Sequence, residues 1–120
     1  MLHEDLTRQI IGAGMTVLSE LRPGLLEKLY ENALILELTA RNHRVDQQRS
    51  FSVHYRGHFI GRLATDLIVD DAVVVDTKAV TDFNQAHVSQ MLGYLNITGL
   101  RVGLLLNFGR ASLQWKRIVL

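Results

Sequence analysis

The apolar residues of this chain change their spacing along its length, and this change constrains the fold most strongly. Over residues 4–21 and 24–41 they recur at helical intervals, whereas from Phe51 to Tyr55 they alternate with polar residues, as in a half-buried strand. The expected elements, in chain order, are helices 4–21 and 24–41, strands 51–55, 59–69 and 72–79, helix 83–98, and strands 102–108 and 112–119. The order ααβββαββ predicts an α/β (α+β) fold, with a mixed central β-sheet flanked by helices.

Residues that start or end regular structure stand at the borders of these segments. Pro23 suits the opening of the second helix, Arg56-Gly57-His58 a turn between the first two strands, and Asp70-Asp71 a tight turn between the next two. Thr81 or Asp82 is expected to cap the third helix. These borders support the division made from the apolar spacing.

The composition is typical of a soluble single domain. The 120 residues are 48% hydrophobic and 21% charged, which suffices for one core, and no repeat or linker divides residues 1–120. No apolar run approaches the roughly 20 residues of a membrane helix. The absence of cysteine excludes disulfides, a cysteine nucleophile and thiolate metal sites, and it fits a reducing compartment. We therefore expect a cytoplasmic protein that does not enter a membrane.

The formal net charge of +1 conceals an uneven distribution of charge. Residues 41–62 hold five arginines against one aspartate, and residues 101–117 hold four basic residues and no acid. Residues 63–82, in contrast, hold five aspartates against one lysine. Ten of the thirteen basic residues are arginines, whose planar guanidinium binds phosphate through paired hydrogen bonds. The basic segments are compatible with a nucleic-acid-binding surface, and an ordinary solvated surface is the alternative.

Three charged residues interrupt the apolar strands on either side of the expected Asp70-Asp71 turn. Such a turn places Asp66 and Asp76 almost opposite each other on adjacent strands, and Lys78 projects from the same face as Asp76. A buried Asp–Lys ion pair would explain one carboxylate and leave a second one in surplus. A divalent cation with oxygen ligands, Mg²⁺, Mn²⁺ or Ca²⁺, would use both. The spacing alone leaves both interpretations open.

Four motifs, in the same order along the chain, resemble one known group of nucleases. Asp66, followed after nine residues by Asp76-Thr77-Lys78, is similar to the split D…(D/E)xK signature of the PD-(D/E)XK nuclease superfamily. Residues 24–30, Gly-Leu-Leu-Glu-Lys-Leu-Tyr, spell the GxxExxY motif that names one family of that superfamily. Residues 90–94 resemble the QxxxY motif of RecB-like nucleases, and residues 99–109 and 116–119 are also similar to the GxxExxY family. The resemblance implies a restriction-endonuclease-like core.

The resemblance also implies roles for individual residues. Glu27, Asp66 and Asp76 would hold a Mg²⁺ or Mn²⁺ ion, and the backbone carbonyl of Thr77 would add a ligand. Lys78 would orient or deprotonate the attacking water and stabilise charge on the phosphate. These five residues form the expected metal and catalytic site.

Two further residues of the third helix belong to the expected site. Gln90 and Tyr94 are four residues apart on one helix face and would hold Lys78, water or a phosphate. A partly buried polar pair without a catalytic role is the alternative for both. For Glu27, the alternative is a charge pair with Lys28 on the helix surface.

These observations predict a metal-dependent nuclease that hydrolyses DNA phosphodiester bonds, with Arg49, Arg56 and Arg62 contacting the nucleic-acid backbone. The family usually has glutamate where this chain has the shorter Asp76, and reaction geometry is sensitive to shifts of about 1 Å. The alternative is therefore a catalytically weak or inactive nuclease-fold module that binds nucleic acid or serves in assembly. Either function is compatible with a homodimer.

Overall fold

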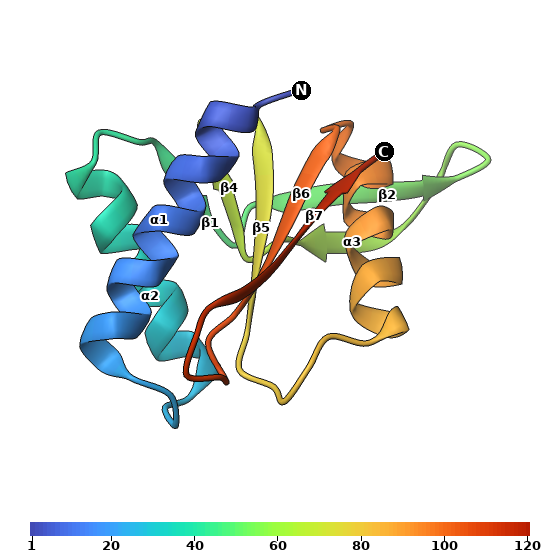
Figure 1. Ribbon diagram of the computed structural model, residues 1–120. Coiled ribbons are helices and arrows are strands. Elements are labelled where there is room, and N and C mark those ends of the chain that lie inside the picture. Colours follow the sequence, from blue (N-terminus) through green and yellow to red (C-terminus); the bar gives the residue numbers. More distant parts are fainter.

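Seven strands and three helices make up the computed structural model, which describes residues 1–120 (Figure 1). The strands are β1 Val45–Gln47, β2 Ser50–Tyr55, β3 His58–Ala64, β4 Leu67–Val69, β5 Val73–Lys78, β6 Val102–Asn107 and β7 Gln114–Val119. Five of them form one sheet in the spatial order β1-β4-β5-β6-β7, and β2 and β3 form a separate two-stranded sheet. Within the larger sheet β5 and β6 run parallel and the other pairs are antiparallel. The expected mixed sheet is thus confirmed.

Helices lie on both faces of the five-stranded sheet. The helices are α1 Glu4–Leu21, α2 Glu27–Ala40 and α3 Gln85–Thr98. In Figure 1, α1 and α2 lie on one side of the sheet and α3 on the other. None of the three combines the length and the apolarity needed to span a bilayer.

Strand β5 lies between two hydrophobic cores, one on each face of the sheet, and its side chains point alternately into one core and the other. Val73 and Val75 belong to the core under α1 and α2, whereas Val74 belongs to the core under α3. This double burial explains why residues 72–75 read as a continuous apolar run. The burial continues into the polar end of the strand, where Asp76 and Thr77 are buried and Lys78 is half-buried.

The second helix begins later than the sequence predicts. α2 starts at Glu27 and not at residue 24, because Gly24 has a φ of 111° and Leu26 has an extended backbone. Neither conformation continues an α-helix. Glu27 therefore lies in the first turn of α2, at the end of the helix that approaches the sheet.

Tyr30 ties the start of α2 to the core. Its ring is fully buried and stacks on Phe108 with a centroid separation of 4.9 Å. Its hydroxyl donates to the carbonyl of Arg22 at 2.5 Å and accepts from the backbone N–H of Leu25 at 3.1 Å. The loop before α2 is therefore held by one buried side chain, and this limits the movement of Glu27.

The predicted strand 59–69 is wrong as a single element, because it is divided into β3 and β4 at Thr65 and Asp66. The sequence also failed to predict β1, which pairs with β4. Across the division the antiparallel register continues: the N–H of Gln48 donates to the carbonyl of Asp66, and the N–H of Thr65 to that of Arg49. Gln48 has a φ of 54°, so the backbone bends there. Asp66 consequently lies at a bend between the two sheets.

The third helix is capped by Asn84, directly before its first residue Gln85, and not by Thr81 or Asp82. The Asn84 side chain accepts from the N–H of His87, whose ring nitrogen accepts from the N–H of Asn84, which forms a capping box. The Asp82 carboxylate is used elsewhere, because it accepts from the side chain of Gln114 at 2.5 Å. With β1 added and the predicted strand 59–69 divided in two, the observed element order is ααβββββαββ.

Candidate functional site

Asp66 and Asp76 face each other across neighbouring strands. Leu67 pairs with Val75 in the β4–β5 ladder, so the next residues outward, Asp66 and Asp76, are opposite one another. The three residues 70–72 connect the paired Val69 and Val73, with Asp70 and Asp71 at positive φ values of 52° and 54°, as is common in the turns of β-hairpins. The strand spacing therefore brings the two carboxylates to one point at the end of the sheet.

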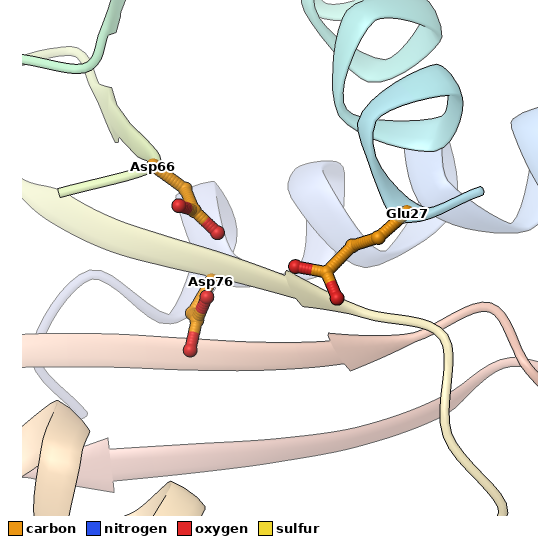
Figure 2. Close-up of side chains that lie close together, drawn as sticks. All are labelled: Glu27, Asp66 and Asp76. Atoms are coloured by element: carbon orange, nitrogen blue, oxygen red, sulfur yellow. The ribbon is translucent and has the colours of Figure 1, made fainter.

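Glu27 joins this pair from the first turn of α2. One carboxylate oxygen from each of Glu27, Asp66 and Asp76 lies within 4.8 Å of the other two (Figure 2). The surface charge pair considered for Glu27 is absent, since Lys28 pairs instead with Glu31, at 2.8 Å. Three carboxylates thus converge from α2, from the bend before β4 and from β5.

The electrostatics of the pair disfavour two bare negative charges. Asp76 is 2% exposed, and its Oδ2 accepts no hydrogen bond although Lys78 Nζ lies 3.2 Å away. Burial is the largest cause that raises the pKa of Asp66, and a hydrogen bond to Asp76 and the negative charge of Asp76 raise it further, to about 7. The hydrogen bond from the Thr77 N–H and the positive charge of Lys78 lower this pKa but do not offset the rise. Burial also raises the pKa of Glu27, which Lys78 partly offsets. Lys78 alone does not neutralise three carboxylates.

This donor set fits a hard divalent cation. The three convergent groups offer only oxygen atoms, which Mg²⁺ and Mn²⁺ prefer, and one of those oxygens is buried without a hydrogen-bond donor. A cation would remove the repulsion that raises the pKa of Asp66. The chemistry of the residues therefore matches a metal site at this end of the sheet.

The remaining expected residues of the site lie around the carboxylates. Thr77 is fully buried in β5, and its N–H donates to Asp66 Oδ2 at 3.3 Å. Lys78 Nζ donates to Oε1 of Gln90 on α3 at 3.3 Å. Burial is the largest cause of a raised pKa of Tyr94, followed by the negative charges of Asp76 and Asp66.

The three expected nucleic-acid-binding arginines differ in their surroundings. Arg49 forms ion pairs with Asp71 at 2.7 Å and with Asp46 at 3.6 Å. Arg56 and Arg62 form no ion pair, and their guanidinium groups lie over the rings of aromatic neighbours in the β2–β3 hairpin. Only the last two arginines therefore present a charge that no acidic residue neutralises.

Glu31 is a part of this region that the sequence analysis did not identify. This residue is 3% exposed, and its Oε2 accepts from Lys28 Nζ at 2.8 Å and from Nε2 of Gln47 at 2.7 Å. Glu31 follows Glu27 by four residues, so both lie on one face of α2. That spacing was the available signal. The Glu31–Gln47 hydrogen bond connects α2 to β1, beside the backbone of Asp66.

Comparison with known proteins gives one match. The family model of the PD-(D/E)XK nuclease superfamily matches residues 4–118, which is nearly the whole chain. The match spans every residue of the carboxylate cluster, from α2 to β5. No curated protein and no solved structure matches the chain.

Proposed function

The chain belongs to the PD-(D/E)XK nuclease superfamily, and on this basis we propose that it is a metal-dependent nuclease that hydrolyses phosphodiester bonds of DNA. The convergence of Glu27, Asp66 and Asp76 within 4.8 Å, with Lys78 beside them, is the observation that carries the proposal. The motif residues resemble those of the GxxExxY family, to which we assign the chain within the superfamily.

The proposed cofactor is Mg²⁺ or Mn²⁺. Glu27, Asp66 and Asp76 would hold it through their carboxylates, and the carbonyl of Thr77 would complete the set. When bound, such a cation lowers the pKa of a coordinated water and stabilises negative charge on the phosphate. The acidic cluster thereby becomes able to accept an anionic substrate.

The proposed role of Lys78 is to orient the attacking water and to donate a hydrogen bond to the phosphate. Its Nζ lies 3.2 Å from Oδ2 of Asp76 and 3.3 Å from Oε1 of Gln90, and these two contacts hold the ammonium beside the carboxylate cluster. In hydrolysis the water oxygen forms a bond to phosphorus while the bond to the leaving oxygen breaks. A positive charge held at this point stabilises the additional negative charge of that transition state. Gln90 positions Lys78, and Tyr94 borders the site with a phenol that stays protonated.

Cleavage of DNA tests this proposal directly. Plasmid and single-stranded DNA are incubated with Mg²⁺ or Mn²⁺ and with wild type, Asp66→Ala, Lys78→Ala or the control Glu20→Ala, which changes an exposed carboxylate away from the cluster. We expect cleavage by wild type and the control, and a loss of at least about 100-fold in the other two. Equal trace activity in all four proteins would refute the catalytic proposal.

The shorter Asp76 favours a second candidate function, a catalytically weak or inactive module of the same fold. Its carboxylate is already 3.2 Å from Lys78, so a simple ion pair accounts for part of its environment. Calorimetric titration with Mn²⁺ separates the two candidates. Binding that Asp66→Asn abolishes supports the nuclease, whereas no binding to wild type supports the inert module.

We also propose a homodimer. β7 lies at one edge of the five-stranded sheet and exposes Trp115, and an open strand edge can pair with another chain. Sedimentation of the purified protein measures the oligomeric state, and a monomer at all concentrations would contradict the proposal.

A further inference from the structure

The β2–β3 hairpin, residues 50–64, extends from the body of the protein as an arm. In Figure 1 it projects past α3, and its two strands are not part of the five-stranded sheet. The arm begins directly at the carboxylate cluster, since Thr65 and Asp66 follow its last strand and hydrogen-bond to Arg49 and Gln48 before its first strand. The position of the arm relative to Asp66 is therefore fixed, and a ligand bound by the arm has a defined position relative to the carboxylate cluster.

One face of the hairpin arm packs on the protein and the other is open. Phe51 packs against the core under α3. On the open face, Ser52 pairs with Arg62 and His54 pairs with Phe59 across the two strands, and all four side chains are exposed. The open face thus carries hydroxyl, imidazole and guanidinium donors in one row.

The hairpin arm is positively charged without acidic neighbours of its own. No aspartate or glutamate occurs between Asp46 and Asp66, whereas the arm contains Arg56, Arg62 and two histidines. Neither arginine forms an ion pair. An exposed, unneutralised row of donors is complementary to a polyanion.

The two arginines of the hairpin arm are supported by aromatic rings. The guanidinium of Arg56 lies 5.2 Å from the ring centroid of Tyr55, and that of Arg62 lies 5.8 Å from that of Phe59. Stacking restrains the guanidinium while its N–H donors stay free for a ligand. The rings are 58% exposed, and the neighbouring Ile60, at a bulge in β3, is 63% exposed. The outer end of the arm is therefore both cationic and apolar.

The dimensions of the hairpin arm match a DNA groove. β2 has six residues and β3 has seven, which gives a length of about 20 Å at roughly 3.3 Å per residue. That length corresponds to about six base pairs, and the major groove, about 12 Å wide, admits a two-stranded β-ribbon. This match in length and width favours duplex over single-stranded nucleic acid.

We infer that the hairpin arm enters the major groove of duplex DNA beside the cleaved bond. Arg62 and Arg56 contact phosphates, and the apolar end formed by Tyr55, Phe59 and Ile60 contacts base edges. The inference rests on the proposed nuclease function, and it adds that duplex DNA is the substrate and that the arm sets its position. Arg62 lies four residues before Asp66, about 13 Å along the strand, so its phosphate contact is several nucleotides from the reacting one.

Binding measured without cleavage tests the inference. Fluorescence anisotropy in EDTA compares a labelled duplex with a single strand of the same length, using wild type, the double variant Arg56→Ala/Arg62→Ala, and the control Arg8→Ala/Arg22→Ala. The control removes the same charge from α1 and from the residue that follows it, outside both basic segments. We expect wild type to prefer the duplex and the double variant to lose about tenfold or more in affinity. Two lost phosphate contacts also reduce the slope of log K against log salt by about 1.8.

The affinities test separately whether the hairpin arm contacts DNA and whether the substrate is a duplex. If the double variant binds the duplex as tightly as wild type, the hairpin arm does not contact DNA. The same conclusion follows if the control loses as much affinity as the double variant. Tighter binding of the single strand overturns the duplex assignment. Because these measurements are made in EDTA, they do not depend on catalysis. A protein that binds through the arm but never cleaves DNA with metal refutes the proposed function alone. An unfolded variant is recognised by circular dichroism, and the single variant Arg62→Ala then replaces it.

Discussion

Asp66 connects the stability of the fold to pH and to metal. Its carboxyl has an ordinary pKa of 3.8 and a raised pKa of about 7 in the folded chain, mainly because it is buried and lies beside Asp76. The folded state therefore binds the proton more tightly than the unfolded state does. The resulting stability is fully present below pH 4 and is lost as the pH rises through about 7.

Replacing Asp66 by asparagine removes this pH dependence. In the absence of divalent cations we expect Asp66→Asn to be more stable than wild type at pH 8 by about 1–2 kcal/mol, since solvent screens part of the side chain, and to differ less at pH 5. With Mn²⁺ at pH 8 the order reverses, because only the wild-type carboxylate holds the cation. Thermal unfolding at the two pH values measures both effects. Parallel pH curves for wild type and Asp66→Asn, with Glu20→Gln as control, would contradict the raised pKa.

A substitution of Gln90 tests the positioning of Lys78 without changing a metal ligand. It accepts from Lys78 Nζ at 3.3 Å and is not part of the carboxylate cluster. We expect Gln90→Ala to lower kcat about tenfold while KM and Mn²⁺ affinity stay near wild type, because the ammonium loses one restraint and the carboxylates lose nothing. Gln85→Ala, an exposed glutamine on the same helix, is the matched control. An equal loss of Mn²⁺ affinity in Gln90→Ala would show that the residue acts on the metal ligands instead.

Among the secondary-structure elements, the sequence predicts those whose pattern is local. The helix at 4–21 has the bounds of α1, because its apolar spacing repeats over several turns. The opposition of Asp66 and Asp76 also follows locally, from the position of the Asp70-Asp71 turn. β1 escapes prediction because three residues are too short to show a period. The bend at Asp66 depends on pairing with a distant segment, which spacing does not reveal.

The convergence of Glu27 with the two aspartates required information beyond apolar spacing. Its place depends on how α2 packs on the sheet, with Tyr30 stacked on Phe108 and Glu31 bonded to Gln47. Both contacts join residues that are distant in the sequence. Only the resemblance of residues 24–30 to a known motif placed Glu27 in the expected site.

The hydrogen bond between α2 and β1 gives a prediction about metal affinity. Gln47 donates to the buried Glu31 at 2.7 Å, and the next residue, Gln48, donates its N–H to the carbonyl of Asp66 at 2.9 Å. Loss of this connection lets Glu27 move relative to Asp66. We expect Gln47→Ala to weaken Mn²⁺ binding about tenfold, as is common for residues that support metal ligands. Calorimetric titration measures it, and Gln48→Ala, which keeps the backbone donor, is the control. Equal affinities in both variants would exclude a supporting role for the hydrogen bond.

Over the whole molecule, opposite charges occupy different regions. The acidic residues of the carboxylate cluster come from α2, β5 and the bend before β4, whereas the hairpin arm carries two arginines, Arg56 and Arg62, and no acidic residue. A cation in the cluster would make the site attractive to a phosphate that the arm has already bound. The near-neutral net charge therefore does not exclude local regions of opposite charge, one at the cluster and one on the arm.

The two hydrophobic cores share one sheet, and this predicts a single unfolding transition. β4, β5 and β6 contribute residues to both cores, so neither core can lose its strands without the other. Trp115, the single tryptophan, reports on the edge strand β7, and far-ultraviolet circular dichroism reports mainly on the helices. We expect both signals to change at the same temperature. A concentration of Mn²⁺ about 100 times its Kd should then add about 2.7 kcal/mol to the free energy of unfolding for both signals. A tryptophan transition at lower temperature that Mn²⁺ does not shift would show instead that β7 detaches independently of the metal site.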